Sequence, residues 1–156
     1  VQTCALPILI KRVISEDIKI SKDERIKLTN NDKFLLVIPL TERASCKYGG
    51  RTKWCVSGKE NNAFEGYRKM CNTVGMVMIK DPEIQMVLNG SKFAINVWGQ
   101  HIEIHNELNE IINNSGKISN EYGFVDEVRE VFNDFINYHN GVCDNKISDE
   151  IGRAHV

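Results

Sequence analysis

The residue types best suited to catalysis or ligand binding lie in the stretch from Tyr48 to Tyr67. Cys55 could act as a nucleophile, because nearby positive charge such as Lys53 lowers the pKa of a thiol. A nucleophilic cysteine also needs a base. His101 or His105 would supply one later in the chain, so one hypothesis is a cysteine-dependent enzyme with Cys55 and one of these histidines.

The same stretch could instead bind an anion. Arg51 and Lys53 bring positive charge, Thr52 adds a hydroxyl, and a predicted helix begins close by, which together suit a phosphate. Three aromatic side chains could stack on a base, namely Tyr48, Trp54 and Tyr67. The Gly49-Gly50 pair lacks the spacing of a P-loop, and a helix end explains it better. This anion site, for a nucleotide or nucleic acid, is the leading interpretation.

An ordinary structural role competes with each of these interpretations. Cys55 could pack as a small apolar side chain beside Trp54. Trp54 and Tyr67 could belong to the core, with the neighbouring charges simply solvated. The cysteines form no Cys-x-x-Cys pair and have no histidine partners at zinc-finger spacing, so the sequence predicts neither a metal site nor a cofactor.

Charge is unevenly distributed although the net charge is only -1. From Glu42 to Lys69 there are seven basic residues and three acidic ones, whereas His101 to Glu150 holds eleven acidic and three basic residues. Such asymmetry bears on partners rather than on the fold. A nucleotide or nucleic acid is the first partner class, and a protein module that binds a host factor is a further alternative. No apolar run could span a bilayer, and the sparse cysteines favour a reducing cytoplasm.

The elements that must position these residues follow from turn signals and periodicity. Residues 25–38 predict a β-hairpin that turns at Asn30-Asn31-Asp32 and ends at Pro39. Thr41 is a predicted N-cap of a short helix that ends at Tyr48, with Gly49 as a left-handed stop. A second short helix is predicted to begin near Asn62, and a loop joins the two.

The following segment predicts an antiparallel meander. Strands are expected at 74–79, 84–88, 92–98 and 102–104, with Asn89-Gly90 as the turn between the second and the third. A short helix is expected around Leu108 to Ile112. The clearest element comes last, because apolar residues from Phe124 to Ile136 recur at helical spacing before a predicted stop at Gly141.

This C-terminal helix must cover an apolar surface, and the inner face of the meander is the obvious partner. The predicted class is therefore α+β: an antiparallel β-meander packed against an amphipathic C-terminal helix, with short helices around the Gly-Gly loop. The two ends resemble translated sequencing adapter, since DNA encoding Ile151–Val156 gives Thr3–Ile8 when its other strand is read. Residues 1–8 and 151–156 are thus expected to be non-native, and residues 9–149 a single domain, itself a fragment.

The segment Pro39–Cys55 resembles a signature of small uncharacterised proteins from tailed bacteriophages and prophages. The shared pattern is Pro-Leu-Thr-x-x-Ala-Ser-x-x-Tyr-Gly-x-x-Thr-Lys-Trp-Cys, followed by Phe-x-x-Tyr at Phe64–Tyr67. The resemblance implies a phage context, a host-cell cytoplasm and no assigned activity. In the family, a later hairpin ends in an aromatic residue and an acidic pair. Here His105, Asn106 and Asn109 stand in those places, which argues against a carboxylate role there.

Overall fold

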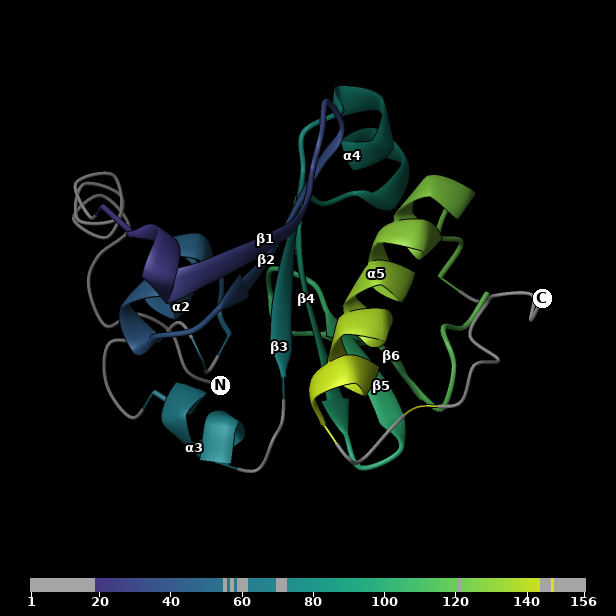
Figure 1. Cartoon of the computed structure of the whole chain (residues 1–156). Helices are drawn as coiled ribbons and strands as arrows, with labels where there is room; N and C mark the ends of the chain where they lie inside the picture. Colours follow the sequence, from purple (N-terminus) through teal and green to yellow (C-terminus); the bar gives the residue numbers. More distant parts are fainter. Residues whose placement is uncertain are drawn as a thin grey trace.

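The structure is a computed structural model that describes residues 19–54, 56, 58, 62–69, 73–120, 122–143 and 147, without the side chains of 68 and 69. Within these residues a six-stranded antiparallel sheet has its strands in sequence order. The C-terminal helix lies on one side of the sheet and two short helices lie on the other (Figure 1). The predicted α+β class, a meander with a C-terminal helix, is confirmed.

The strands are β1 (Arg25–Asn30), β2 (Phe34–Pro39), β3 (Val74–Ile79), β4 (Lys92–Trp98), β5 (His101–His105) and β6 (Ile111–Ser115). The helical elements are the short 3-10 helix η1 (Lys22–Glu24), α2 (Glu42–Tyr48), α3 (Phe64–Lys69), α4 (Pro82–Leu88) and α5 (Asp126–Val142). Residues 40–73 connect β2 to β3 and contain α2, the Gly-Gly loop and α3. The predicted hairpin, both short helices flanking the loop and the strands at 74–79 and 92–98 are all present.

Residues 84–88 form helix α4, so the prediction of a strand there is wrong. The Asp81 side chain accepts a hydrogen bond from the Glu83 N–H at 2.9 Å, and Pro82 occupies the first turn. Asn89 ends the helix in the left-handed conformation, with φ 53°. Asp81-Pro82 is thus a helix start and not merely a strand breaker, and Asn89 is a helix cap rather than part of a hairpin turn.

The predicted helix around Leu108 to Ile112 is also wrong, because β6 begins at Ile111. A tight turn precedes it. The Asn106 side-chain oxygen accepts from the Leu108 N–H at 3.0 Å and from the Glu110 N–H at 2.9 Å, and Asn109 has φ 66°. Asparagine chemistry of this kind closes a turn between antiparallel strands, which leaves β6 as an edge of the sheet.

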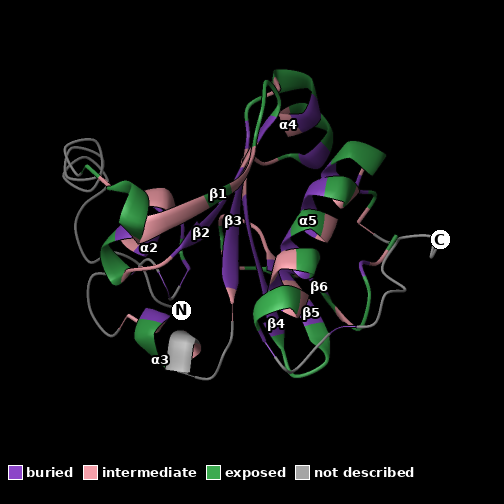
Figure 2. Ribbon diagram, viewed as in Figure 1, coloured by how far each residue is buried: buried purple, intermediate pink, exposed green. Residues whose placement is uncertain are grey.

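One face of the sheet, here called the α5 face, holds the larger core. It carries Phe93, Ile95 and Val97 of β4, and α5 covers it with the inward residues Val128, Val131, Phe132, Phe135, Ile136 and His139. Figure 2 shows buried residues along β3 and recurring along α5. Packing is so close at Gly75 that a Cβ atom there would lie 2.5 Å from a ring carbon of Phe135.

Helix α5 ends later than predicted. Gly141 lies inside it, and the helix closes where the Cys143 N–H donates to the His139 carbonyl at 3.0 Å. Cys143 is disulfide-bonded, which the sparse cysteines did not predict. No helix among the described residues is long and apolar enough to cross a membrane.

The opposite face, here called the loop face, carries the alternate residues of the same strands, such as Ala94, Asn96 and Trp98 of β4. A smaller core forms on it from Trp54, Val56, Phe64, Val74, Met76 and Ala94. Helices α2 and α3 lie on this side of the sheet (Figure 1), and the smaller core joins Trp54 and Phe64 to residues of β3 and β4. The stretch with the predicted chemistry therefore sits on the loop face.

Candidate functional site

The candidate site begins where α2 ends and the chain turns through residues 49–54, here called the basic loop. Gly49 follows the helix with φ -87°, so it is not the left-handed residue that the sequence predicted. Arg51 takes that conformation instead, with φ 67°. A non-glycine residue in this region is strained by about 1–2 kcal/mol, and such strain recurs at functional positions because the surrounding structure must enforce it.

Buried polar contacts hold the backbone of the basic loop. The Thr52 hydroxyl donates to the Gly49 carbonyl at 2.6 Å, and Thr52 is only 1% exposed. The Lys92 ammonium, from β4, donates to the Tyr48 carbonyl at 3.1 Å and to the Gly50 carbonyl at 2.8 Å. Carbonyl groups at a helix end need such partners. Thr52 thus fixes the loop, and its hydroxyl is not directed to a ligand as predicted.

A second set of contacts joins the basic loop to the turn between β5 and β6. The Trp54 indole N–H donates to the Asn106 carbonyl at 2.7 Å, and the Lys53 N–H donates to the Glu107 carbonyl at 2.9 Å. Trp54 is 2% exposed and belongs to the smaller core. An indole buried to this extent has no open surface for a base, so the predicted stacking role of Trp54 is replaced by a structural one.

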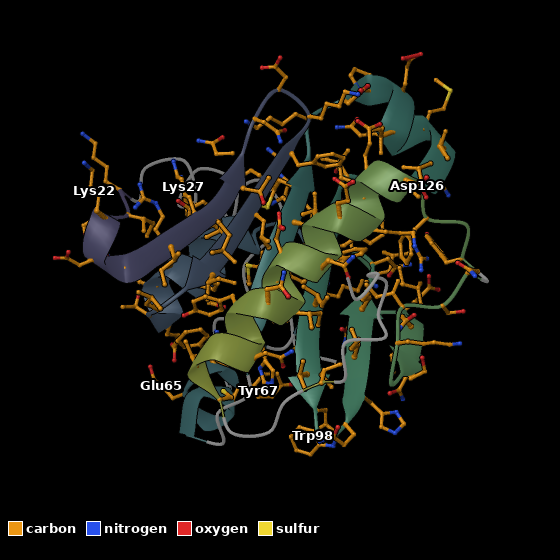
Figure 3. The ribbon with its side chains drawn as sticks, turned by 45° about the vertical axis from the view of Figure 1, so that its right-hand side comes forward. Lys22, Lys27, Glu65, Tyr67, Trp98 and Asp126 are labelled. Atoms are coloured by element: carbon orange, nitrogen blue, oxygen red, sulfur yellow. The ribbon has the colours of Figure 1, made fainter. Side chains whose placement is uncertain are left out.

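The two tyrosines of the predicted site, Tyr48 and Tyr67, make different contacts. The Tyr48 hydroxyl accepts from the Arg25 Nε at 3.0 Å, and its ring packs on the smaller core. Tyr67, on α3 (Figure 3), also packs there, and together with Thr73 and Tyr138 it lines a pocket of ≈ 240 Å³. Both rings are half-buried, so neither repeats the exposed stacking surface that the sequence analysis expected.

Arg51 and Lys53 are the predicted site residues that reach solvent. Both side chains are exposed, and neither makes a side-chain hydrogen bond or an ion pair within the described residues. Nearby cations differ, since Arg43 contacts Glu24 at 2.7 Å and Arg25 contacts Tyr48. The basic loop therefore presents two uncommitted positive charges on a fixed backbone.

The two histidines project from β5 on the loop face, as alternation predicts. His105 stands opposite Ala94, and its Nε2 lies 3.3 Å from a carboxylate oxygen of Glu103. Its Nδ1 is buried and has no hydrogen-bond partner among the described residues. His101 is exposed, and its Nδ1 lies 3.1 Å from the Asn114 side-chain oxygen.

Cys55 lies outside the described residues, but the position of its neighbour Trp54 shows which of the two histidines lies nearer to the end of the basic loop. The Trp54 indole reaches the Asn106 carbonyl, and Asn106 directly follows His105. The basic loop thus ends beside His105, whereas His101 lies at the opposite end of β5, four residues earlier in the sequence. Of the two candidate bases, His105 is the one that the fold brings towards this loop.

Sequence reasoning missed three residues that shape the site: Lys92, Glu103 and Asn106. Glu103 could have been found, because alternation along β5 places it between the two histidines on one face. Lys92 and Asn106 act through contacts with the basic loop from more than forty residues away, and no local pattern marks such contacts. Among the described residues there is no group of three or more histidine, cysteine, aspartate or glutamate side chains that could hold a metal ion.

Comparison with known proteins adds no relative: no family model, no curated protein and no solved structure matches this chain.

Proposed function

We propose that this domain binds an anionic ligand, a nucleotide or a nucleic acid, through the basic loop. The observation that carries the proposal is the pair Arg51 and Lys53, both exposed and uncommitted on a backbone held by buried contacts. Because these contacts already hold the loop in one conformation, ligand binding costs the protein little conformational entropy. Because neither cation has an ion pair with another described residue, no such pair must be broken before a phosphate is bound.

The contributions within the loop divide into contact and support. Arg51 and Lys53 make contact, and guanidinium groups suit phosphate oxygens particularly well. Thr52, Trp54 and Lys92 hold the loop in place. The strained backbone at Arg51 supports this division, because the loop keeps this residue in an unfavourable conformation while leaving its side chain in solvent.

The test is a double substitution, Arg51→Ala with Lys53→Ala, measured with fluorescein-labelled (dT)12 and with ATP at low salt. We expect at least a tenfold loss of affinity for (dT)12. Each lost phosphate contact on a single strand should also reduce the slope of log K against log salt by about 0.7.

The matched control, Lys22→Ala with Lys117→Ala, removes the same charge from two exposed lysines elsewhere on the chain. We expect its affinity to stay within about twofold of the unmodified protein when both are measured at about 0.1 M salt, where charges more than about 10 Å apart are largely screened. Equal losses of affinity in both double variants would show that binding depends on the overall positive charge of the protein and not on the basic loop. No binding of (dT)12 or ATP by the unmodified protein would overturn the proposal.

A specific observation favours a second function, a cysteine-dependent enzyme. The His105 Nδ1 is buried and has no partner in the described part of the chain, and a carboxylate lies beside the other ring nitrogen. With the proton on Nε2, the ring donates to Glu103 and leaves Nδ1 able to accept a proton from a thiol. Trp54, which precedes Cys55, is bonded to the residue that follows His105.

Iodoacetamide labelling tests this second function. An activated Cys55 should be alkylated at neutral pH well ahead of Cys46, a partly buried thiol whose sulfur lies 3.7 Å from the Gly58 carbonyl oxygen and which serves as an internal reference. His105→Gln should slow labelling of Cys55 about tenfold and leave Cys46 unchanged. If Cys55 reacts only after denaturation, it is structural and the enzyme reading is lost.

A further inference from the structure

A pocket of ≈ 240 Å³ lies where the ends of four elements meet: the end of β2, helix α3, the start of β3 and the end of α5. It is at the far end of β3 from the basic loop. Val74, which lines the pocket, pairs with Asn96, whereas Met78 pairs with Lys92, the residue that is bonded to the basic loop. With a rise of about 3.3 Å per residue, Val74 and Met78 are about 13 Å apart, so the pocket is separate from the anion site.

The lining of the pocket is aromatic and uncharged. Phe64 and Tyr67 of α3 and Tyr138 of α5 contribute rings to it, and Figure 3 shows Tyr67 near the C-terminal end of α5. None of the described residues that line the pocket carries a charge. A phosphate placed here would lose its hydration without gaining an ionic partner from them. The pocket therefore suits an uncharged ligand with a flat apolar body that packs on aromatic rings.

The volume of the pocket limits the size of this ligand. An apolar protein cavity of about 150 Å³ takes up benzene, and drug-sized ligands occupy pockets of about 300–1,000 Å³. A volume of ≈ 240 Å³ lies between these and corresponds to a compound of two fused rings. The lining ranges from Phe64, which is 2% exposed, to Val142, which is 55% exposed. The pocket thus lies at the boundary between the smaller core and the surface.

One hydroxyl gives the pocket a position for a hydrogen bond. The Thr73 oxygen lies 2.6 Å from Nδ1 of His139, whose ring is fully buried. A hydroxyl has one proton and two lone pairs, so this oxygen keeps at least one lone pair whichever of the two groups supplies the proton between them. The Cys143 sulfur, 4.0 Å away, belongs to a disulfide and has no proton to donate. Thr73 can therefore accept a hydrogen bond from a ligand.

We propose that this pocket binds a small neutral heteroaromatic compound of two fused rings, whose N–H donates to the Thr73 hydroxyl. The site goes beyond the proposed function, because it needs no anionic group and uses no residue of the basic loop. Indole is the matching probe, since it is bicyclic and uncharged and carries one N–H. 1-Methylindole has the same rings without the donor, so the two compounds together separate ring packing from the hydrogen bond.

The experiment is a calorimetric titration of the whole chain with indole, in buffer without reducing agent because Cys143 is disulfide-bonded. We expect a dissociation constant below about 1 mM, as for other small ligands that fill a pocket. 1-Methylindole should bind about three- to tenfold more weakly, because it cannot make the hydrogen bond. Thr73→Val keeps the shape of the side chain and removes the acceptor, so its affinity for indole should fall to that for 1-methylindole.

A second variant fills the pocket without removing a hydrogen-bonding group. Val142→Phe adds a ring to the exposed end of the lining and should weaken the binding of both compounds at least tenfold. The matched control, Val87→Phe, makes the same change at an exposed valine of α4 and should leave binding unaltered. No binding of indole, unchanged binding by Val142→Phe, or equal affinity for indole and 1-methylindole would each overturn this proposal. Affinity of Val142→Phe for (dT)12 should equal that of the unmodified protein, so failure here is distinguishable from failure of the anion site.

Discussion

The two faces of the sheet are closed in different ways. The α5 face is covered by one long helix whose inward side chains are almost entirely apolar. The loop face is covered by short segments, and side-chain hydrogen bonds to backbone carbonyls fix their positions, as at Thr52, Trp54 and Lys92. Hydrophobic burial is non-directional, whereas hydrogen bonds fix orientation. The α5 face thus supplies stability, and the loop face supplies defined positions for polar groups.

Among the variants that test this difference between the faces, Phe132→Ala should have the largest effect on the free energy of unfolding. Phe132, on the inward side of α5, is fully buried, and its ring meets Phe124 edge-on with centroids 5.1 Å apart. The free energy of unfolding in urea should fall by about 3–5 kcal/mol, because the change leaves a cavity in the main core. Glu130→Ala, on the exposed side of the same helix, should stay within about 0.5 kcal/mol. A small loss at Phe132 would mean that the α5 face does not dominate stability.

Two glycines sharpen the contrast between the faces. Gly75→Ala would place a methyl group 2.5 Å from a Phe135 ring carbon on the α5 face, and overpacking should cost about 1–3 kcal/mol. Gly66→Ala, in α3 on the loop face, meets no atom within 4 Å and should stabilise by about 0.5–1 kcal/mol. Chemical denaturation of both variants gives the signs, and a shared sign would show that the faces are packed alike.

On the loop face, Trp54→Phe keeps an aromatic ring and removes the N–H that donates to the Asn106 carbonyl. The unfolding free energy should fall by about 1–2 kcal/mol, from the lost hydrogen bond and the smaller ring. Affinity for (dT)12 should fall as well, because the bond ties the basic loop to the β5–β6 turn. A variant that loses stability but binds unchanged would show that this tie does not position Arg51 and Lys53.

The smallest expected effect depends on pH. The hydrogen bond from Arg43, assisted by the Ser21 backbone and Thr41 and opposed by partial burial, lowers the pKa of Glu24 from 4.5 to about 2. A lowered pKa in the folded state stabilises the protein above the unfolded value, and this contribution is lost as pH falls from about 4.5 towards 2. Melting temperatures of the unmodified protein and of Glu24→Gln should therefore converge over this range. Parallel curves would contradict the assignment.

The sequence predicted the strongly periodic elements best. Helix α5 and strand β4 repeat their apolar residues often enough for one period to dominate. α4 and β6 are short, so the residues at their ends determine their structure. Asp81 and Asn89 cap helix α4, and Asn106 closes the turn that precedes β6.

The residues of the candidate site show the same division between local and distant signals. Local composition located Arg51 and Lys53. The burial of Thr52 and Trp54 could not be foreseen, because it depends on β4 and on the β5–β6 turn, which lie far away in sequence. Trp98 is exposed because it lies at the end of β4. This exposure could not be predicted without knowing which parts of the sheet the helices cover.

Residues 40–73 interrupt the meander between two strands that pair directly, and they carry the whole basic loop. The entropy of closing such a connection rises by only about 0.6 kcal/mol when its length doubles. Insertions and exchanges of sequence are therefore cheap here, and costly almost anywhere else in the sheet. Over evolutionary time, related chains could change the side chains that this one connection displays while inheriting the same framework.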